Sequence, residues 1–333
     1  MGSKSVDLLS ELRSRSQIDC DTLDVTIAKE LGPFIGSTSN QADAYLELLL
    51  PHRADLLQES LLLARQISGD YTDVPFKELA FEIAMVKLSL AIALHVKETV
   101  FVMSNPSLTS SSEVVKNASR IVALTSRVSP TFPLSRLCIK VAATWEGLQA
   151  CRQLTALGIS TLATTVFTTE QAILAGECGC IYISPFVHEL KAAFDESYDD
   201  GGANLAVCVE AQRYYEYFSY PTRVKAAALL TVEEAKKLAG VASITIPPDL
   251  LRTLAATETM EDDIDNLSLF AKDKHKKEDK PVRRTYMDDE AGWREAFGKA
   301  YNGKGSRNTA EAIDEFREYQ LKAEQLMLTK GDW

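Results

Sequence analysis

A lysine in an apolar, strand-like segment is the residue of this sequence most suited to covalent chemistry. Lys140 lies in the stretch LCIKVAATWEGLQA, residues 137–150, with apolar or β-branched residues on both sides. Burial there would remove water from the ammonium group and favour the neutral amine, which is a nucleophile. A neutral amine attacks a ketone or aldehyde to form a Schiff base, which is an electron sink for making or breaking the adjacent carbon–carbon bond.

Schiff-base chemistry also needs groups that move protons near the amine. Asp21 and the hydroxyl of Thr164 are candidates for that role. The alternative is that Lys140 extends from a strand end into solvent or pairs with a carboxylate. Spacing alone slightly favours this alternative.

Short β-branched runs alternate with longer amphipathic runs along most of the chain. Eight strands are predicted, over 16–22, 33–39, 99–104, 137–144, 160–167, 180–186, 222–229 and 243–248. Helix-like segments separate them, including a continuous one over 41–67. Eight strand–helix repeats over about 250 residues predict a (β/α)8 barrel, or TIM barrel. The alternative is a doubly wound open sheet, but no glycine-rich nucleotide-binding loop follows any predicted strand.

Polar residues inside buried strands require a reason, because strands covered on both faces are otherwise apolar. Four such residues fall at or near the C-terminal ends of their predicted strands: Asp21, Lys140, Thr164 and Ser184. In a barrel, these strand ends form the catalytic face. The pattern therefore predicts an active site there.

Three further segments are predicted around the barrel, which is expected to span residues 16–260. An N-terminal extension or helix precedes it at 1–15. Residues 261–290 include the run KDKHKKEDKPVRRTYMDDE, which is dense in both charges, so a charged loop is predicted. Helical spacing of apolar residues returns in 291–333, and this segment is predicted to pack on the barrel.

The overall composition is that of a globular protein without a nucleic-acid or membrane partner. The net charge of −11 opposes a phosphate backbone, and no charge-free span approaches the ~20 residues that a bilayer requires. The six cysteines are scattered and the four histidines lack metal-ligand spacing, so reduced thiols, no metal and no other cofactor are predicted. We expect a cytoplasmic protein that acts on a small molecule.

Five segments, in order along the chain, resemble motifs of the transaldolase family. IKVAATWEG around Lys140 is similar to the segment that carries the family's Schiff-base lysine. The others are CDTLD at 20–24, STSNQ at 37–41, TLATTVFTTEQA at 161–172 and CIYISPFVHEL at 180–190. The resemblance runs from about Asp19 to Ile246, and a similar helical tail follows. It implies a TIM barrel and a divergent Schiff-base aldolase.

The resemblance also implies a role for each matching residue. Lys140 corresponds to the nucleophile, Asp21 to the general acid/base, and Thr164 to a threonine that helps to hold the catalytic water. The residues implied to contact the substrate are Thr38, Asn40, Ser184 and Phe186. A homodimer is a further implication, since transaldolases are often dimers.

Several positions depart from the family's usual pattern. Met103 stands where a third-strand glutamate is usual, and Glu189 stands where an arginine usually grips the sugar phosphate. A serine and a second arginine are replaced by Ala228 and Leu230, and a fifth-strand asparagine by Leu162. A carboxylate repels a phosphate dianion, and a methionine makes a pocket more apolar. Met103 and Glu189 are therefore predicted to lie in a pocket for a less polar carbonyl substrate.

Three functions remain open from the sequence. The favoured one is a transaldolase-like enzyme that makes, breaks or transfers an aldol-type bond on a non-phosphorylated carbonyl substrate in a specialised biosynthetic pathway. The second is an ordinary transaldolase of the pentose phosphate pathway, which would need a different alignment or phosphate contacts from Arg223 and Lys225. The third is a catalytically inactive barrel that serves as a binding or scaffold protein.

Overall fold

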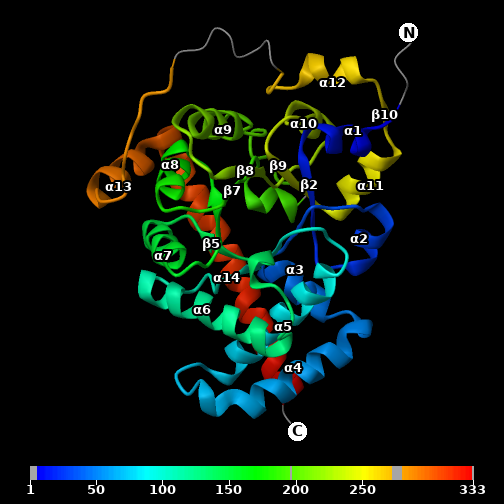
Figure 1. Cartoon of the computed structure of the whole chain (residues 1–333), viewed down its shortest axis with the longest axis vertical. Helices are drawn as coiled ribbons and strands as arrows, with labels where there is room; N and C mark the ends of the chain where they lie inside the picture. The colour runs from blue at the N-terminus through cyan, green and yellow to red at the C-terminus, as the bar shows by residue number, and fades with distance from the viewer. Residues whose placement is uncertain (1–5, 196, 272–279, 332–333) are drawn as a thin grey trace.

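Eight parallel strands form a closed barrel, in which the last strand pairs with the first (Figure 1). The computed structural model describes residues 6–195, 197–271 and 280–331. The barrel strands are β2 (Gln17–Asp21), β3 (Ser37–Thr38), β4 (Val100–Met103), β5 (Leu137–Ala142), β6 (Thr161–Val166), β7 (Tyr182–Pro185), β8 (Arg223–Ala226) and β9 (Ser243–Ile246). The predicted (β/α)8 barrel is confirmed.

Helices cover the outside of the barrel between successive strands. They are α2 (Val25–Leu31), α5 (Phe76–Ala93), α6 (Ser111–Val128), α7 (Trp145–Ala156), α8 (Thr169–Glu177), α9 (Ala206–Phe218), α10 (Val232–Lys237) and α11 (Pro248–Ala256). Several begin with a reciprocal cap; in α6 the Ser110 hydroxyl accepts from the Glu113 N–H, and the Glu113 carboxylate accepts from the Ser110 N–H. Each such cap fixes where the loop before its helix ends.

The continuous helix predicted over 41–67 is wrong, because a turn interrupts it. The segment forms α3 (Gln41–Leu48), the 3-10 turn η1 (Pro51–Arg53) and α4 (Ala54–Ile67). Leu50, before the proline, has an extended backbone. Proline disfavours helical geometry in the residue before it and has no N–H to donate, so the helix ends there.

The N-terminal half of the barrel interior is filled by an apolar cluster and one buried ion pair. The cluster consists of Phe101, Cys138, Leu162 and Tyr182. Beside it, Lys225 of β8 forms an ion pair with Asp19 of β2 and donates to Ser243 Oγ at 2.7 Å. Both charged side chains are almost fully buried. The pair therefore joins β8 to β2 at a level of the barrel below the C-terminal strand ends.

The N-terminal segment packs beside the barrel. β1 (Val6–Asp7) pairs antiparallel with β10 (Glu258–Thr259), and α1 (Leu8–Arg15) leads into β2. Helix α1 is anchored because its apolar face is buried, at Leu8, Leu9 and Leu12. Residues 1–5 of the predicted extension lie outside the described residues.

The segment 261–290 begins with a helix, which corrects the prediction of a charged loop throughout. Helix α12 (Glu261–Leu267) forms because Ile264 finds a fully buried position against the barrel helices. Residues 272–279 of the predicted loop are outside the described part of the chain. Two helices follow, α13 (Glu290–Lys299) and α14 (Lys304–Gly331), separated by the 3-10 turn η5 (Ala300–Gly303).

Helix α14 crosses the barrel at the C-terminal ends of its strands and is the long red helix in Figure 1. Phe316 packs edge-on against Phe186, with ring centres 6.5 Å apart. Near the start of the helix, Gln171 Nε2 donates to Thr309 Oγ1 at 3.1 Å. A Cβ on Gly305 would lie 2.2 Å from the Thr168 side chain, so the helix approaches α8 at a distance that only glycine permits.

Candidate active site

Lys140 lies inside the barrel near the C-terminal end of β5, and the residue is 4% exposed. Its amine donates to the carbonyl oxygen of Ser39, which follows β3, at 3.3 Å. Burial lowers the pKa of Lys140, while the negative charges of Asp21 and Asp43 raise it and offset part of the effect. The net direction favours the neutral, nucleophilic amine.

Asp21 ends β2 and faces the same region of the barrel. Thr38 Oγ1 donates to Asp21 Oδ1 at 2.6 Å, and the same hydroxyl contacts Thr245 Oγ1. Burial raises the pKa of Asp21, and the positive charge of Lys140 opposes that shift. Thr38 therefore orients the carboxyl group, and Asp21 and Lys140 influence each other's protonation.

Asn40 caps the first turn of α3 and is partly occupied by that role. Its Oδ1 accepts from the N–H groups of Ala42 at 2.8 Å and Asp43 at 3.1 Å. The carboxamide oxygen is thus engaged with the helix, and the NH₂ group is the part of the side chain suited to a ligand.

Asp43 is a carboxyl group that the sequence did not indicate as part of the site. Its Oδ2 accepts from the Asn40 N–H at 3.1 Å. Burial, followed by the charge of Asp21, raises the pKa of Asp43 to about 8. The Ser39–Asn40 peptide group therefore contacts Lys140 through its carbonyl and Asp43 through its N–H. The N-x-x-D spacing is visible in the sequence as a helix cap, but its proximity to Lys140 is not.

Thr164 has a buried hydroxyl without a hydrogen-bond partner among the described residues. It lies on β6, where the pairing with β7 shifts register between Ala163 and Val166 and Thr165 adopts a φ of +56°. A buried, unpaired hydroxyl costs about 1–3 kcal/mol, so this group is available to a water or substrate oxygen.

The remaining predicted residues occupy different parts of the catalytic face. Met103 of β4 is buried directly across from Lys140 in the strand register. Ser184 and Phe186 are buried on and just after β7, and Phe186 stacks edge-on with Phe167 at 5.7 Å. Glu189 lies farther along the same loop, so the structure brings Met103 to Lys140 while Glu189 belongs to a neighbouring cluster.

Glu189 is held by residues of the chain itself. Its Oε1 lies 2.9 Å from Lys304 Nζ of α14, and its Oε2 accepts from the Tyr198 hydroxyl at 2.6 Å. With Phe186 and His188, it lines a cavity of about 220 Å³ next to the start of α14. The Glu189 charge is therefore compensated within the protein.

Comparisons with known proteins support the family indicated by these motifs. The family model described as Transaldolase/Fructose-6-phosphate aldolase matches residues 18–322. Transaldolase from Alteromonas mediterranea is 30% identical over 258 residues, which cover 74% of this chain and 78% of the relative. Transaldolase from Methylococcus capsulatus is 31% identical over 264 residues, covering 76% and 79%. The chain belongs to the transaldolase/fructose-6-phosphate aldolase family.

One solved structure with a related name is similar only at a low level. Fructose-bisphosphate aldolase from Campylobacter jejuni aligns over 72% of this chain and 74% of its own, with a TM-score of 0.42 and 13% identity. The fold assignment rests on the closed barrel itself. Within the described ranges, none of the helices combines the length and apolar character needed to cross a bilayer.

Proposed function

We propose that this chain is a transaldolase-like enzyme in which Lys140 forms a Schiff base with a ketone or aldehyde. The main support is the setting of Lys140, which is buried on the catalytic face, donates to a peptide oxygen and has a lowered pKa. The neutral amine adds to the carbonyl carbon, and the resulting carbinolamine loses water to give an iminium ion. The iminium then accepts the electron pair of the bond between its α and β carbons as that bond breaks. The β-hydroxyl proton passes to the Asp21 carboxylate, an aldehyde leaves and an enamine remains, and the reverse of this step forms the bond.

Asp21 is the proposed general acid/base. Its raised pKa lets the carboxyl group hold a proton for the departing carbinolamine hydroxyl, and the carboxylate can then take a proton back from the water that hydrolyses the iminium. The free hydroxyl of Thr164 is suited to holding that water. Thr38 orients Asp21, while Asn40 and Ser184 are the proposed contacts for substrate oxygens.

The charges around the site favour a substrate without a phosphate group. Glu189, where the resemblance places an arginine, is compensated by Lys304 and Tyr198. Lys225 is committed to its buried pair with Asp19. Arg223 begins β8 and therefore lies at the opposite, N-terminal end of the strand. Neither cation is placed to replace the missing phosphate contacts, which argues against a sugar phosphate.

The second candidate is an ordinary transaldolase that transfers a dihydroxyacetone unit between sugar phosphates. The names of relatives that are 30% and 31% identical favour it. A coupled assay with fructose 6-phosphate and erythrose 4-phosphate separates the candidates. Turnover at rates typical of metabolic enzymes, about 1 per second or faster, would favour this second function over ours.

Borohydride trapping tests the Schiff base directly. The protein is incubated with hydroxyacetone or dihydroxyacetone, reduced, digested and mapped by mass spectrometry. We expect a reduced adduct on the peptide that contains Lys140, and its loss in Lys140→Ala. Because Lys225 is also buried but ion-paired, its peptide is the internal control and should remain unmodified. An adduct on other lysines alone, or none with either compound, would reject the assignment.

A further inference from the structure

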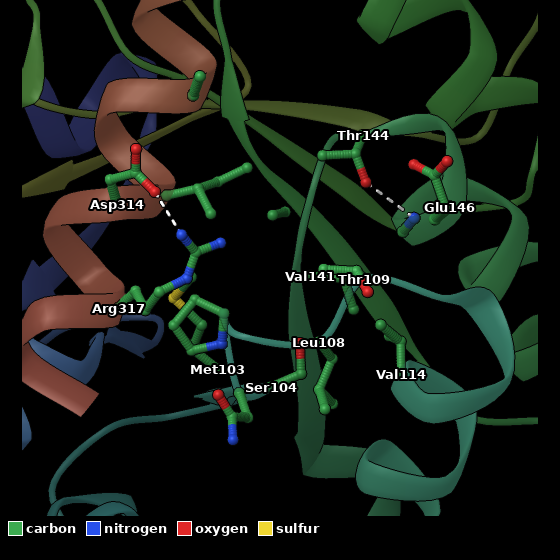
Figure 2. A pocket seen from close by; sticks show the side chains of 16 residues that line it. Met103, Ser104, Leu108, Thr109, Val114, Val141, Thr144, Glu146, Asp314 and Arg317 are labelled. Carbon is green, nitrogen blue, oxygen red and sulfur yellow. Dashed lines mark hydrogen bonds and ion pairs between the residues drawn. The ribbon is translucent and has the colours of Figure 1, made fainter. Parts of the chain in front are cut away.

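A cavity of about 370 Å³ opens at the C-terminal ends of β4 and β5, beneath α14 (Figure 2). Met103 and Ser104 line it at the end of β4, and Val141 lines it from β5. Figure 2 shows Asp314 and Arg317 of α14 on one side and Val114 of α6 on the other. A cavity of this volume is in the range of sites that bind small organic molecules.

This cavity begins at the immediate neighbours of Lys140. Met103 is the residue paired with Lys140 in the β4–β5 register. The Ser104 N–H donates to the Lys140 carbonyl oxygen at 2.9 Å, and Val141 is next in the chain. Lys140 itself does not line the cavity, so Met103, which is paired with Lys140 and also lines the cavity, is the link between them. A substituent on a compound joined to the Lys140 amine would pass Met103 to enter this space.

The lining of the cavity is suited to an apolar substituent. Side chains of Met103, Leu108, Val114, Val141 and Ile313 form one apolar part of its lining, and the polar residues Ser104, Asn105, Thr109 and Thr144 line other parts. The charged groups at its edge are already paired: Arg317 NH1 lies 2.5 Å from Asp314 Oδ1, and Glu146 pairs with Arg294 at the same distance. An alkyl or aryl group placed against the apolar part of the lining would gain from burial.

We propose that this cavity binds an apolar arm of the carbonyl substrate, an alkyl or aryl group of roughly six to ten carbon atoms. The inference rests on the proposed function, because it assumes that the carbonyl carbon reacts with Lys140. It identifies the substrate class as ketones or aldehydes with a hydrophobic substituent. Met103, in place of an acidic residue, forms the apolar contact between the reacting carbon and the cavity.

Two ketones of different length test this proposal. Hydroxyacetone is the short probe, and 4-phenylbutan-2-one carries an aryl arm. We expect the aryl ketone to half-saturate borohydride trapping on Lys140 at a concentration at least tenfold lower. Ala310→Trp fills the mouth of the cavity from an exposed position of α14, so it requires no change in the core. It should reduce the trapping preference for the aryl ketone over hydroxyacetone at least tenfold.

Leu321→Trp is the matched control, since it adds an indole to an exposed position of the same helix outside the cavity. It should leave the preference unchanged. If hydroxyacetone is trapped on Lys140 but the aryl ketone shows no preference, or Ala310→Trp leaves the preference intact, the cavity proposal is wrong and the proposed function stands.

A second measurement separates the two hypotheses if no adduct forms. Calorimetric titration with 4-phenylbutan-2-ol, which cannot form a Schiff base, reports on the cavity alone. Saturable binding that Ala310→Trp weakens tenfold would support the cavity while the proposed function failed. Absence of binding to the unaltered protein would overturn the cavity proposal.

Discussion

Two buried lysines of this barrel have opposite surroundings. Lys225 contacts the Asp19 carboxylate and lies 4.4 Å from the centre of the Tyr182 ring, so its positive charge is stabilised. Lys140 donates to a peptide oxygen, and its pKa is lowered by burial. Both amines are therefore buried but differ in what they contact, a carboxylate for Lys225 and a peptide oxygen for Lys140.

Replacing Asp43 by asparagine should move the pH dependence of Schiff-base formation to lower pH. The Asp43 charge raises the pKa of Lys140, and that charge is present mainly above the Asp43 pKa of about 8. Without the Asp43 charge, the neutral Lys140 amine forms at lower pH. The pH range in which the trapping rate rises therefore moves to lower pH. Initial rates of cyanoborohydride trapping with hydroxyacetone across the neutral and alkaline range measure this shift.

Asparagine is a close control for the structural role of Asp43, because its carboxamide oxygen can still accept from the Asn40 N–H. Asp43→Ala removes that hydrogen bond as well, and should lower the free energy of unfolding by about 0.5–2 kcal/mol. A pH profile of Asp43→Asn identical to that of the unaltered protein would show that Asp43 is a helix cap and nothing more.

Lys225→Met should destabilise the barrel by about 3–5 kcal/mol, because it leaves the Asp19 carboxylate buried without its partner. Urea unfolding followed by circular dichroism gives this difference. The double variant Lys225→Met/Asp19→Asn removes both charges and should recover much of the loss, since asparagine can still accept from the Gly36 N–H. If the free energy of unfolding of Lys225→Met were within about 1 kcal/mol of that of the unaltered protein, this account of the pair would be wrong.

At the scale of elements, a histidine joins the loop after β7 to α10. His188 Nδ1 lies 2.9 Å from Asp200 Oδ2, and Nε2 lies 3.0 Å from Glu234 Oε1. Asp200 Oδ2 also accepts from the Glu189 N–H at 2.9 Å, and Lys304 donates to the Asp200 carbonyl oxygen. One imidazolium therefore stabilises the conformation of a loop that borders the catalytic face.

This contact should make stability depend on pH. The carboxylates of Glu234 and Asp200 raise the pKa of His188 above its ordinary value of 6.5. The stabilisation is fully present below that ordinary value, and is lost as the pH rises through the raised pKa. We expect the melting temperature to fall between about pH 6 and pH 9, and His188→Gln to reduce this fall.

His188→Gln should lower the free energy of unfolding by about 1–2 kcal/mol at pH 6, because a hydrogen bond to a charged group contributes about that much. At pH 9 it should lower it much less. His95→Gln is the control, because the His95 side chain has no carboxylate partner among the described residues, and it should leave the pH profile unchanged. Equal losses for His188→Gln at both pH values would indicate a packing effect instead of a charge effect.

At the scale of the whole molecule, α14 fixes the mouth of the barrel. Its residues contact α3, α5 and β6, which are far apart in the sequence. Phe316 is fully buried and packs on Phe186 from the loop after β7. The helix therefore couples the stability of the barrel to the shape of its catalytic face.

Phe316→Ala should lower the free energy of unfolding by about 3–5 kcal/mol, the usual cost of removing a buried aromatic ring. Urea unfolding measures it, and Leu321→Ala on the exposed side of the same helix should change it by less than about 0.5 kcal/mol. A loss below about 1 kcal/mol for Phe316→Ala would indicate that α14 is not part of the cooperative core.

Most of the strands and helices could be predicted from the sequence, and two features could not. The eight strands were predictable because apolar, β-branched runs mark buried parallel strands, and their observed bounds fall within the predicted ranges. The break at Pro51 was not predictable, because the apolar periodicity continues across it. The helix at Glu261–Leu267 was not predictable either, because its many charged residues obscure the buried Ile264. The roles of Lys140, Asp21 and Thr164 stay predictions until they are tested.

The sequence by itself determined the barrel and the position of Lys140 within an apolar strand, because hydrophobic periodicity is a local property of the chain. The tertiary structure decided what surrounds the amine. Closure of the barrel places Ser39 and Asp43, which follow β3, beside a lysine of β5. Folding of α14 across the strand ends places Arg317 and Met103 around one cavity. These proximities join residues far apart in the chain, and so depend on how all the elements pack together.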